Sequence, residues 1–156
     1  MLRNDGAFAA FDDVTATALQ NKHPEAPDIT LSAIENIESL SCTDEHIVAA
    51  ILKLLAGGAP GPDGLRPCHL KQFCCLGSGS MRQTMLQTLK DFGSLCIAGQ
   101  SPPSIRHLLF GASLFALKKK DEGLRPIAVG NTLRRFVSSV CCVALKDQVA
   151  TMLAPF

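Results

Sequence analysis

The sequence predicts an α+β fold that is mostly helical and contains one antiparallel β-hairpin. Three observations predict it: apolar residues recur at helical spacing in three segments, two short apolar runs flank a basic turn, and glycine and proline clusters separate these parts. The 156 residues are 47% hydrophobic and have a mean hydropathy of +0.21, which suffices to bury the core of one domain.

The N-terminal part, residues 1–40, is predicted to be a loosely ordered extension ahead of a folded domain at residues 41–156. Within the extension, FDDVTATALQNKHP favours a short helix capped by Asp12 or Asp13. The two prolines of HPEAPDIT then break that helix. This part is therefore interpreted as an extension or linker.

Two longer helices are predicted in the first half of the domain. One begins at Thr43 and ends at Gly57, and the other covers about residues 81–97 and ends before Gly99. Their apolar stripes are expected to face the core. The stripe positions are Ile47, Ala50, Ile51, Leu54 and Leu55 in the first helix, and Met81, Met85, Leu89, Phe92 and Cys96 in the second.

A β-hairpin is predicted from two apolar runs that a basic turn separates. ASLFALK is typical of a short buried strand, KKDEG of a turn, and LRPIAVG of a second strand. Pro126 cannot donate a backbone hydrogen bond, so it is expected at a strand start or an edge. It also favours an extended backbone at Arg125, which would hold that side chain on a stiff segment.

A long C-terminal helix is predicted after Gly130, with Asn131 or Thr132 as its cap. Arg134 and Arg135 lie near its N-terminal end. The apolar stripe that predicts the helix is Leu133, Phe136, Val137, Val140, Cys141 and Ala144.

The basic residues of the hairpin suit a phosphate-rich ligand. Lys118, Lys119 and Lys120 supply point charges and Arg125 supplies a planar fork, a combination that matches a triphosphate. The alternative is that the lysines only keep an exposed strand edge soluble. These residues by themselves leave both interpretations open.

Charge is distributed unevenly along the chain, although its formal net charge is only +1. Residues 1–64 carry 3 basic and 10 acidic side chains, whereas residues 65–156 carry 12 basic and 4 acidic ones. The C-terminal part therefore has the electrostatic character of a surface for phosphates or nucleic acid, with a solvated basic face as the alternative.

The cysteines favour a reducing environment. Seven cysteines, an odd number with two adjacent pairs, do not suit a disulfide framework, and MLRNDGAF is not typical of a signal peptide, so we expect an intracellular protein of the nucleus or cytoplasm. The nearest metal-like set lacks a CxxC and a returning pair, so buried cysteines are favoured over zinc. The longest apolar stretch, LLFGASLFAL, is shorter than the roughly 20 residues of a bilayer span, and no membrane partner is expected.

Two blocks of the sequence carry a family resemblance together. The first, ILKLLAGGAPGPDGLRPCHLK at 51–71, contains a helix, a Pro-Gly-Pro-Asp-Gly block and L-x-x-x-x-L-K; the second, LFALKKKDEGLRPIAVGNTLRRFVSSV at 114–140, contains a strand, a basic turn, an RPI strand and a helix. Both blocks resemble the fingers region of reverse transcriptases, most closely those of non-LTR retrotransposons. The resemblance covers roughly residues 40–156, a partial reverse transcriptase domain.

The resemblance implies that the hairpin belongs to a fingers subdomain, which closes over an incoming deoxynucleotide on a template. Arg125 matches the family's arginine that contacts the triphosphate, and Lys118 or Lys119 matches its lysine partner, with the register open by one residue. Weak binding of nucleotide and of an RNA or DNA template-primer is expected. The residues expected near the template are Lys120, Arg134, Arg135, Gly61, Asp63 and Gly64.

The resemblance also implies which parts of an RNA-directed DNA polymerase are missing. In that family, the polymerase is a nucleotidyltransferase that holds two Mg²⁺ ions with paired carboxylates of its palm domain. After Arg125 the only carboxylate is Asp147, whereas Asp12 and Asp13 precede the fingers and lack the aromatic residue of the palm motif. We therefore expect a truncated fragment without the palm, inactive as a polymerase alone, with no catalytic residue and no metal site; Mg²⁺ is expected only in a full-length polymerase.

Two alternatives stay open on the sequence. In the first, the chain is a non-catalytic module derived from a retroelement, and it binds nucleic acid or protein. In the second, it is a structural helical domain without a site. Binding to single-stranded RNA, duplex or deoxynucleotide discriminates between these classes.

Overall fold

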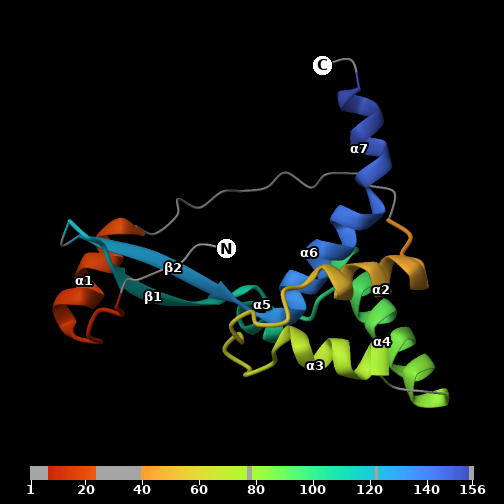
Figure 1. The fold of residues 1–156 in the computed structure, drawn as a ribbon, viewed down its shortest axis with the longest axis horizontal. Coiled ribbons are helices and arrows are strands. Elements are labelled where there is room, and N and C mark those ends of the chain that lie inside the picture. The colour runs from red at the N-terminus through yellow and green to blue at the C-terminus, as the bar shows by residue number, and fades with distance from the viewer. Residues whose placement is uncertain (1–6, 24–39, 77–78, 122, 155–156) are drawn as a thin grey trace. The chain divides into compact units, whose positions relative to one another are not determined.

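The computed structural model describes residues 7–23, 40–76, 79–121 and 123–154. These residues are mostly helical and include one two-stranded antiparallel sheet, which confirms the α+β class (Figure 1). The elements are α1 (Asp13–Lys22), α2 (Asp44–Lys53), α3 (Pro67–Lys71), a π-helical turn (Gln72–Leu76), α4 (Ser80–Ile97), α5 (Pro103–Phe110), β1 (Ala112–Lys118), β2 (Leu124–Gly130), α6 (Thr132–Ala144) and α7 (Lys146–Leu153).

The chain divides into two compact units, which we name the hairpin unit and the helical unit. Of the described residues, the hairpin unit holds those within Met1–Ile37 and Ser113–Val129. The helical unit holds those within Glu38–Ala112 and Gly130–Phe156. The described N-terminal residues thus group with the hairpin.

The core of the helical unit lies among α2, α4 and α6. Both α2 and α6 form where the apolar spacing predicts a helix, and the interior-facing positions of the two helices pack together. The buried core residues are Cys42, Ile47, Ala50, Ile51, Leu70, Cys74, Leu86, Leu89, Phe136 and Val140. Burial of these apolar side chains is the main source of the unit's stability.

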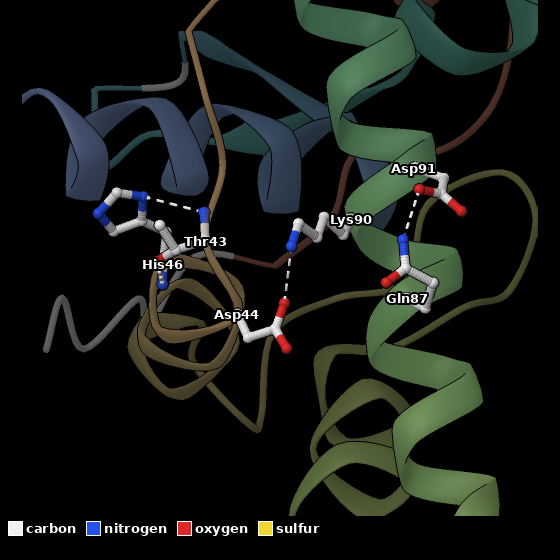
Figure 2. Close-up of polar contacts among 6 residues, drawn as sticks. All are labelled: Thr43, Asp44, His46, Gln87, Lys90 and Asp91. Atoms are coloured by element: carbon white, nitrogen blue, oxygen red, sulfur yellow. Dashed lines mark hydrogen bonds and ion pairs between the residues drawn. The ribbon is translucent and has the colours of Figure 1, made fainter.

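Polar contacts fix the start of α2 and join it to α4, as Figure 2 shows. The Thr43 side chain accepts a hydrogen bond from the His46 backbone N–H, and the His46 ring accepts one from Thr43 N–H, which together form a capping box. Lys90 of α4 reaches Asp44 with a nitrogen-to-oxygen distance of 3.0 Å. Both side chains of this pair are partly exposed, so it orients the helices more than it stabilises them.

The predicted face of α4 is partly wrong. Leu86, Leu89 and Gly93 are its buried residues, whereas Met81 is 70% exposed. Met81 lies in the first turn of the helix, ahead of the part that α2 and α6 cover. The methionine at the start of the stripe is therefore a surface residue.

The sequence misses α3 and α5, which both begin with proline. Neither segment is among the predicted helices, yet Pro67 and Pro103 are each the first residue of one. A proline fits there because the first N–H groups of a helix have no intrahelical partner and proline's fixed φ is already helical.

The predicted long C-terminal helix is interrupted at Leu145, and α6 and α7 differ in direction by 52°. The apolar stripe stops there because Lys146, Asp147 and Gln148 are polar. No residue of α7 is buried, and Figure 1 shows this helix continuing away from α2 and α4. Because α7 buries none of its residues against the core, packing does not hold it on the axis of α6.

No single described helix is both long and apolar enough to cross a bilayer. Only the bent pair α6 and α7, taken together, satisfies the length and composition of a span.

The hairpin unit confirms the two strands and the short N-terminal helix. Both strands have the predicted bounds, and a short segment at Phe8 pairs antiparallel with Leu117 on the other edge of β1. Asp12 caps α1, and its side chain accepts a hydrogen bond from Thr15 N–H at 2.8 Å. Hydrogen bonding from Thr15 lowers the pKa of Asp12, so this cap is ionised at neutral pH.

Candidate nucleic-acid interface

The Pro-Gly-Pro-Asp-Gly loop packs against the N-terminus of α6. A Cβ atom on Gly61 would lie 2.6 Å from the Asn131 Cα, so only glycine allows this approach of the two backbones. The Thr132 hydroxyl donates a hydrogen bond to the Leu65 carbonyl. Two segments that are far apart in sequence, and that were both expected near the template, are thus in direct contact.

Asp63 and Gly64 close the loop itself. The Asp63 carboxylate accepts a hydrogen bond from Leu65 N–H at 3.1 Å, and Gly64 N–H donates one to the Gly61 carbonyl at 3.0 Å. Gly64 has a φ of +73°, a conformation that favours glycine. Asp63 therefore has a turn-forming role in the loop, beside any contact with a ligand.

The two arginines of α6 are anchored to backbone carbonyls. Arg134 is exposed and donates to the Phe110 carbonyl at 2.8 Å, whereas the half-buried Arg135 donates to the Ala59 carbonyl and to the Thr132 hydroxyl. Arg135 thus holds the loop onto the helix. Because a guanidinium has five N–H donors, the exposed Arg134 keeps donors for a further acceptor.

The backbone pairing of the hairpin determines which side chains share a face. Lys119 N–H donates to the Gly123 carbonyl at 2.7 Å, so Lys119 is opposite Gly123. Continuing this antiparallel register through two strands of equal length places Leu117 opposite Arg125 and Phe115 opposite Ile127.

Backbone hydrogen bonds on the other edge of β1 indicate the same strand register independently. Ala9 N–H donates to the Ala116 carbonyl at 2.9 Å, and Lys118 N–H donates to the Ala7 carbonyl at 3.0 Å. Even-numbered residues of β1 therefore turn their backbone groups away from β2, and odd-numbered ones turn them toward it. By the same register Pro126 turns its nitrogen outward, where the missing N–H interrupts no ladder bond.

This register places Lys119 and Arg125 on one face of the sheet and Lys118 on the other. The Lys119 Cδ lies 3.4 Å from where a Gly123 Cβ would be, so the lysine side chain lies close to Gly123, the residue just before β2. Lys118 is near Asp12, since its ammonium charge contributes to the lowered pKa of that carboxyl, after the Thr15 hydrogen bonds. The strand pairing thus separates Lys118 and Lys119 between the two faces of the sheet.

Exposure is the common property of the hairpin's basic side chains. Lys118, Lys119, Lys120 and Arg125 are all exposed, and Lys120 lies in the turn. The prediction of a buried strand is wrong for part of β1, because Phe115 is 44% exposed while Ala116 and Leu117 are buried. The hairpin therefore offers charge and aromatic surface to solvent.

Other chemistry is sparse among the described residues. No three His, Cys, Asp or Glu side chains gather there to hold a metal ion. Burial raises the pKa of the Cys42 and Cys141 thiols, which leaves both protonated at neutral pH. A shallow hollow along α4 has no charged lining residue and does not suit a phosphate.

No protein-family model, curated protein or solved structure matches this chain. The assignment of function therefore rests on the residues themselves. Sequence reasoning found the basic residues but missed Phe8 and Phe115 as surface groups. The alternation of side chains between the two faces of a strand could have indicated that Phe115 is exposed. The pairing of Phe8 with β1 has no local signal in the sequence.

Replacing Gly61 by alanine tests the close approach of the loop to α6. We expect Gly61→Ala to lower the free energy of unfolding by about 1–3 kcal/mol, because the added methyl group overlaps the Asn131 backbone. The control Gly57→Ala meets no atom within 4 Å and should change stability by less than about 1 kcal/mol. Urea unfolding measures both, and equal stability of the two variants would contradict the contact.

Thr132→Val tests the second link between loop and helix. The substitution keeps the shape of this fully buried side chain but removes the donor to Leu65 and the acceptor for Arg135. We expect a loss of about 1–3 kcal/mol in thermal or urea unfolding. Thr132→Ser retains the hydroxyl and should cost less; a valine variant as stable as the serine variant would argue against the bond.

Proposed function

We propose that the chain is the fingers part of a reverse transcriptase resembling those of non-LTR retrotransposons, and that it binds a nucleoside triphosphate and template without polymerising nucleotides by itself. One observation carries the proposal. Within the helical unit, the two sequence blocks that bear the resemblance contact each other through Gly61 with Asn131 and through Leu65 with Thr132.

The triphosphate site is proposed on the face that carries Arg125 and Lys119. Arg125 supplies a fork that matches two phosphate oxygens, and Lys119 supplies a second positive charge on the same side of the sheet. Lys118 is the weaker candidate, because it lies on the opposite face near Asp12. We therefore assign the lysine partner of Arg125 to Lys119, with Lys118 outside the site.

The template contacts are proposed on each unit by itself. In the hairpin unit the contact is Lys120, and in the helical unit the contacts are Arg134 and the loop of Gly61, Asp63 and Gly64. Contacts to sugar and phosphate need exposed donors, and Arg134 and Lys120 are exposed. Arg135 contributes through its bond to the Ala59 carbonyl, which holds the loop in place. We infer that the groups of each unit contact a nucleic-acid backbone and read no sequence.

The polymerase reaction is not proposed for these residues. Two-metal phosphoryl transfer needs paired carboxylates, and Asp147 is the only carboxylate after Arg125. Asp12 is committed to capping α1 through Thr15. Any RNA-directed DNA polymerase activity therefore needs palm carboxylates that are not among these 156 residues.

A protein-binding module is the second candidate, and α7 is the observation that favours it. Val149, Met152 and Leu153 are exposed along this short helix, which has no buried residue. Such a surface suits a protein partner better than a phosphate. Replacing these residues by serine, two at a time, would weaken protein association and leave nucleotide binding intact.

Nucleotide binding tests the proposed triphosphate site. We expect Arg125→Gln and Lys119→Gln each to weaken binding of a fluorescent deoxynucleoside triphosphate about three- to tenfold, because both charges face the same ligand in an exposed site. The matched control Lys118→Gln removes the same charge from the other face and should change the Kd less than twofold. Equal effects of the two lysine variants would indicate attraction by net charge alone.

Primer extension tests the absence of polymerase chemistry. The purified chain, given an RNA template, a DNA primer, deoxynucleotides and Mg²⁺, is expected to incorporate no nucleotide. Incorporation above that of a no-protein control would overturn the assignment. Binding to the same template-primer should be weak and should fall steeply with salt, since phosphate contacts release counterions.

A further inference from the structure

The hairpin unit has a sheet face that combines aromatic and basic side chains, which we name the open sheet face. Phe8 is opposite Leu117, and Leu117 is opposite Arg125, so these three residues form one row across the three paired segments. Phe115 is two residues before Leu117 on the same face, and Lys119 is two residues after it. The face therefore runs from an aromatic end to a basic end.

The aromatic end is exposed to solvent. Phe8 is 70% exposed and Phe115 is 44% exposed, and their rings meet edge to face with centroids 6.1 Å apart and an interplanar angle of 61°. Leu117 between them is buried. The two rings thus shield the leucine on one side and keep their other surfaces free.

The opposite face of the hairpin strands carries no aromatic side chain. It carries Ala116, which is buried, and Lys118, whose charge lies near Asp12 at the start of α1. The open sheet face thus carries both rings together with Lys119 and Arg125, and neither cation forms an ion pair among the described residues.

We propose that the open sheet face binds single-stranded nucleic acid. Bases stack on Phe8 and Phe115, and the adjoining phosphates contact Lys119 and Arg125. Exposed aromatic rings beside positive charges are the combination that single-strand binding proteins use, because every base has a π-face and every nucleotide a phosphate. The proposal goes beyond the triphosphate site, since stacking needs neither a triphosphate nor a catalytic domain.

Charge decides between a nucleic acid and a protein partner for this face. An apolar protein surface gains nothing from two cations at the end of the aromatic row, whereas a polynucleotide neutralises both. The hairpin sequence, residues 112–130, contains two acidic residues, both in the turn, against four basic ones. A duplex is the poorer ligand, because its bases are already stacked and paired.

Fluorescence anisotropy with a labelled 12-nucleotide single-stranded RNA tests the proposal on the full chain. The matched probes are an abasic oligonucleotide of the same length, which keeps the phosphates, and a duplex. We expect the base-containing strand to bind at least about tenfold more tightly than the abasic one. Equal binding of the two would overturn stacking as the mode of recognition.

Variants locate the site on the open sheet face. Phe8→Leu and Phe115→Leu remove the π-face but keep apolar volume over Leu117, and each is expected to weaken RNA binding about five- to a hundredfold with an unchanged salt dependence. Phe8→Tyr and Phe115→Tyr keep a stacking ring and should bind like the wild type. Phe11→Leu is the control, since Phe11 is fully exposed and outside the ring pair.

Variants that remove a positive charge are expected to change the salt dependence of RNA binding. Arg125→Gln and Lys119→Gln should each reduce the slope of log affinity against log salt concentration by about one. Leucine variants that bind RNA like the wild type would overturn the proposal and leave the aromatic end for a protein partner. Triphosphate binding measured in parallel separates the two hypotheses, because the leucine variants should not change it.

Discussion

The close contact between the Gly61 backbone and Asn131 is the constraint on which the helical unit depends. With no side chain at Gly61, the loop reaches the N-terminus of α6, where Thr132 and Arg135 bind its carbonyl groups. Asn131 in turn caps α6 by accepting a hydrogen bond from Leu133 N–H at 2.9 Å. One missing Cβ thus allows the loop, the cap and the first turn of the central helix to form a single hydrogen-bonded corner.

Local signals predicted most of the fold. The hairpin bounds follow from two apolar runs and a charged turn, and the caps at Asp12, Thr43 and Asn131 follow from side chains that accept backbone N–H bonds. The errors have a common cause in tertiary packing. Proline at the start of α3 and α5 is compatible with either a loop or a helix. The bend at Leu145 depends on which helix faces pack against other elements. Those choices are made by tertiary contacts and not by the local sequence.

The candidate site was predictable in composition but not in arrangement. Arg125 and the lysines follow from charge alone, yet the choice between Lys118 and Lys119 depends on strand parity. That parity is determined by the bond from Lys119 to Gly123 and by a third segment, at Ala7 to Ala9, more than a hundred residues away in sequence. A one-residue change of strand register would exchange the two faces completely, so the face of each lysine depends on these long-range backbone bonds.

The sheet's edges explain why its faces remain available for binding. β1 is paired on both sides, with β2 and with the segment at Phe8, so it has no free edge over that stretch. β2 has an outer edge, but Pro126 lies there with no N–H to offer an added strand. Strand addition is therefore disfavoured at both edges of the sheet. The face of Phe8, Phe115 and Arg125 is left as the surface for which we propose a ligand with flat apolar bases and negative charge.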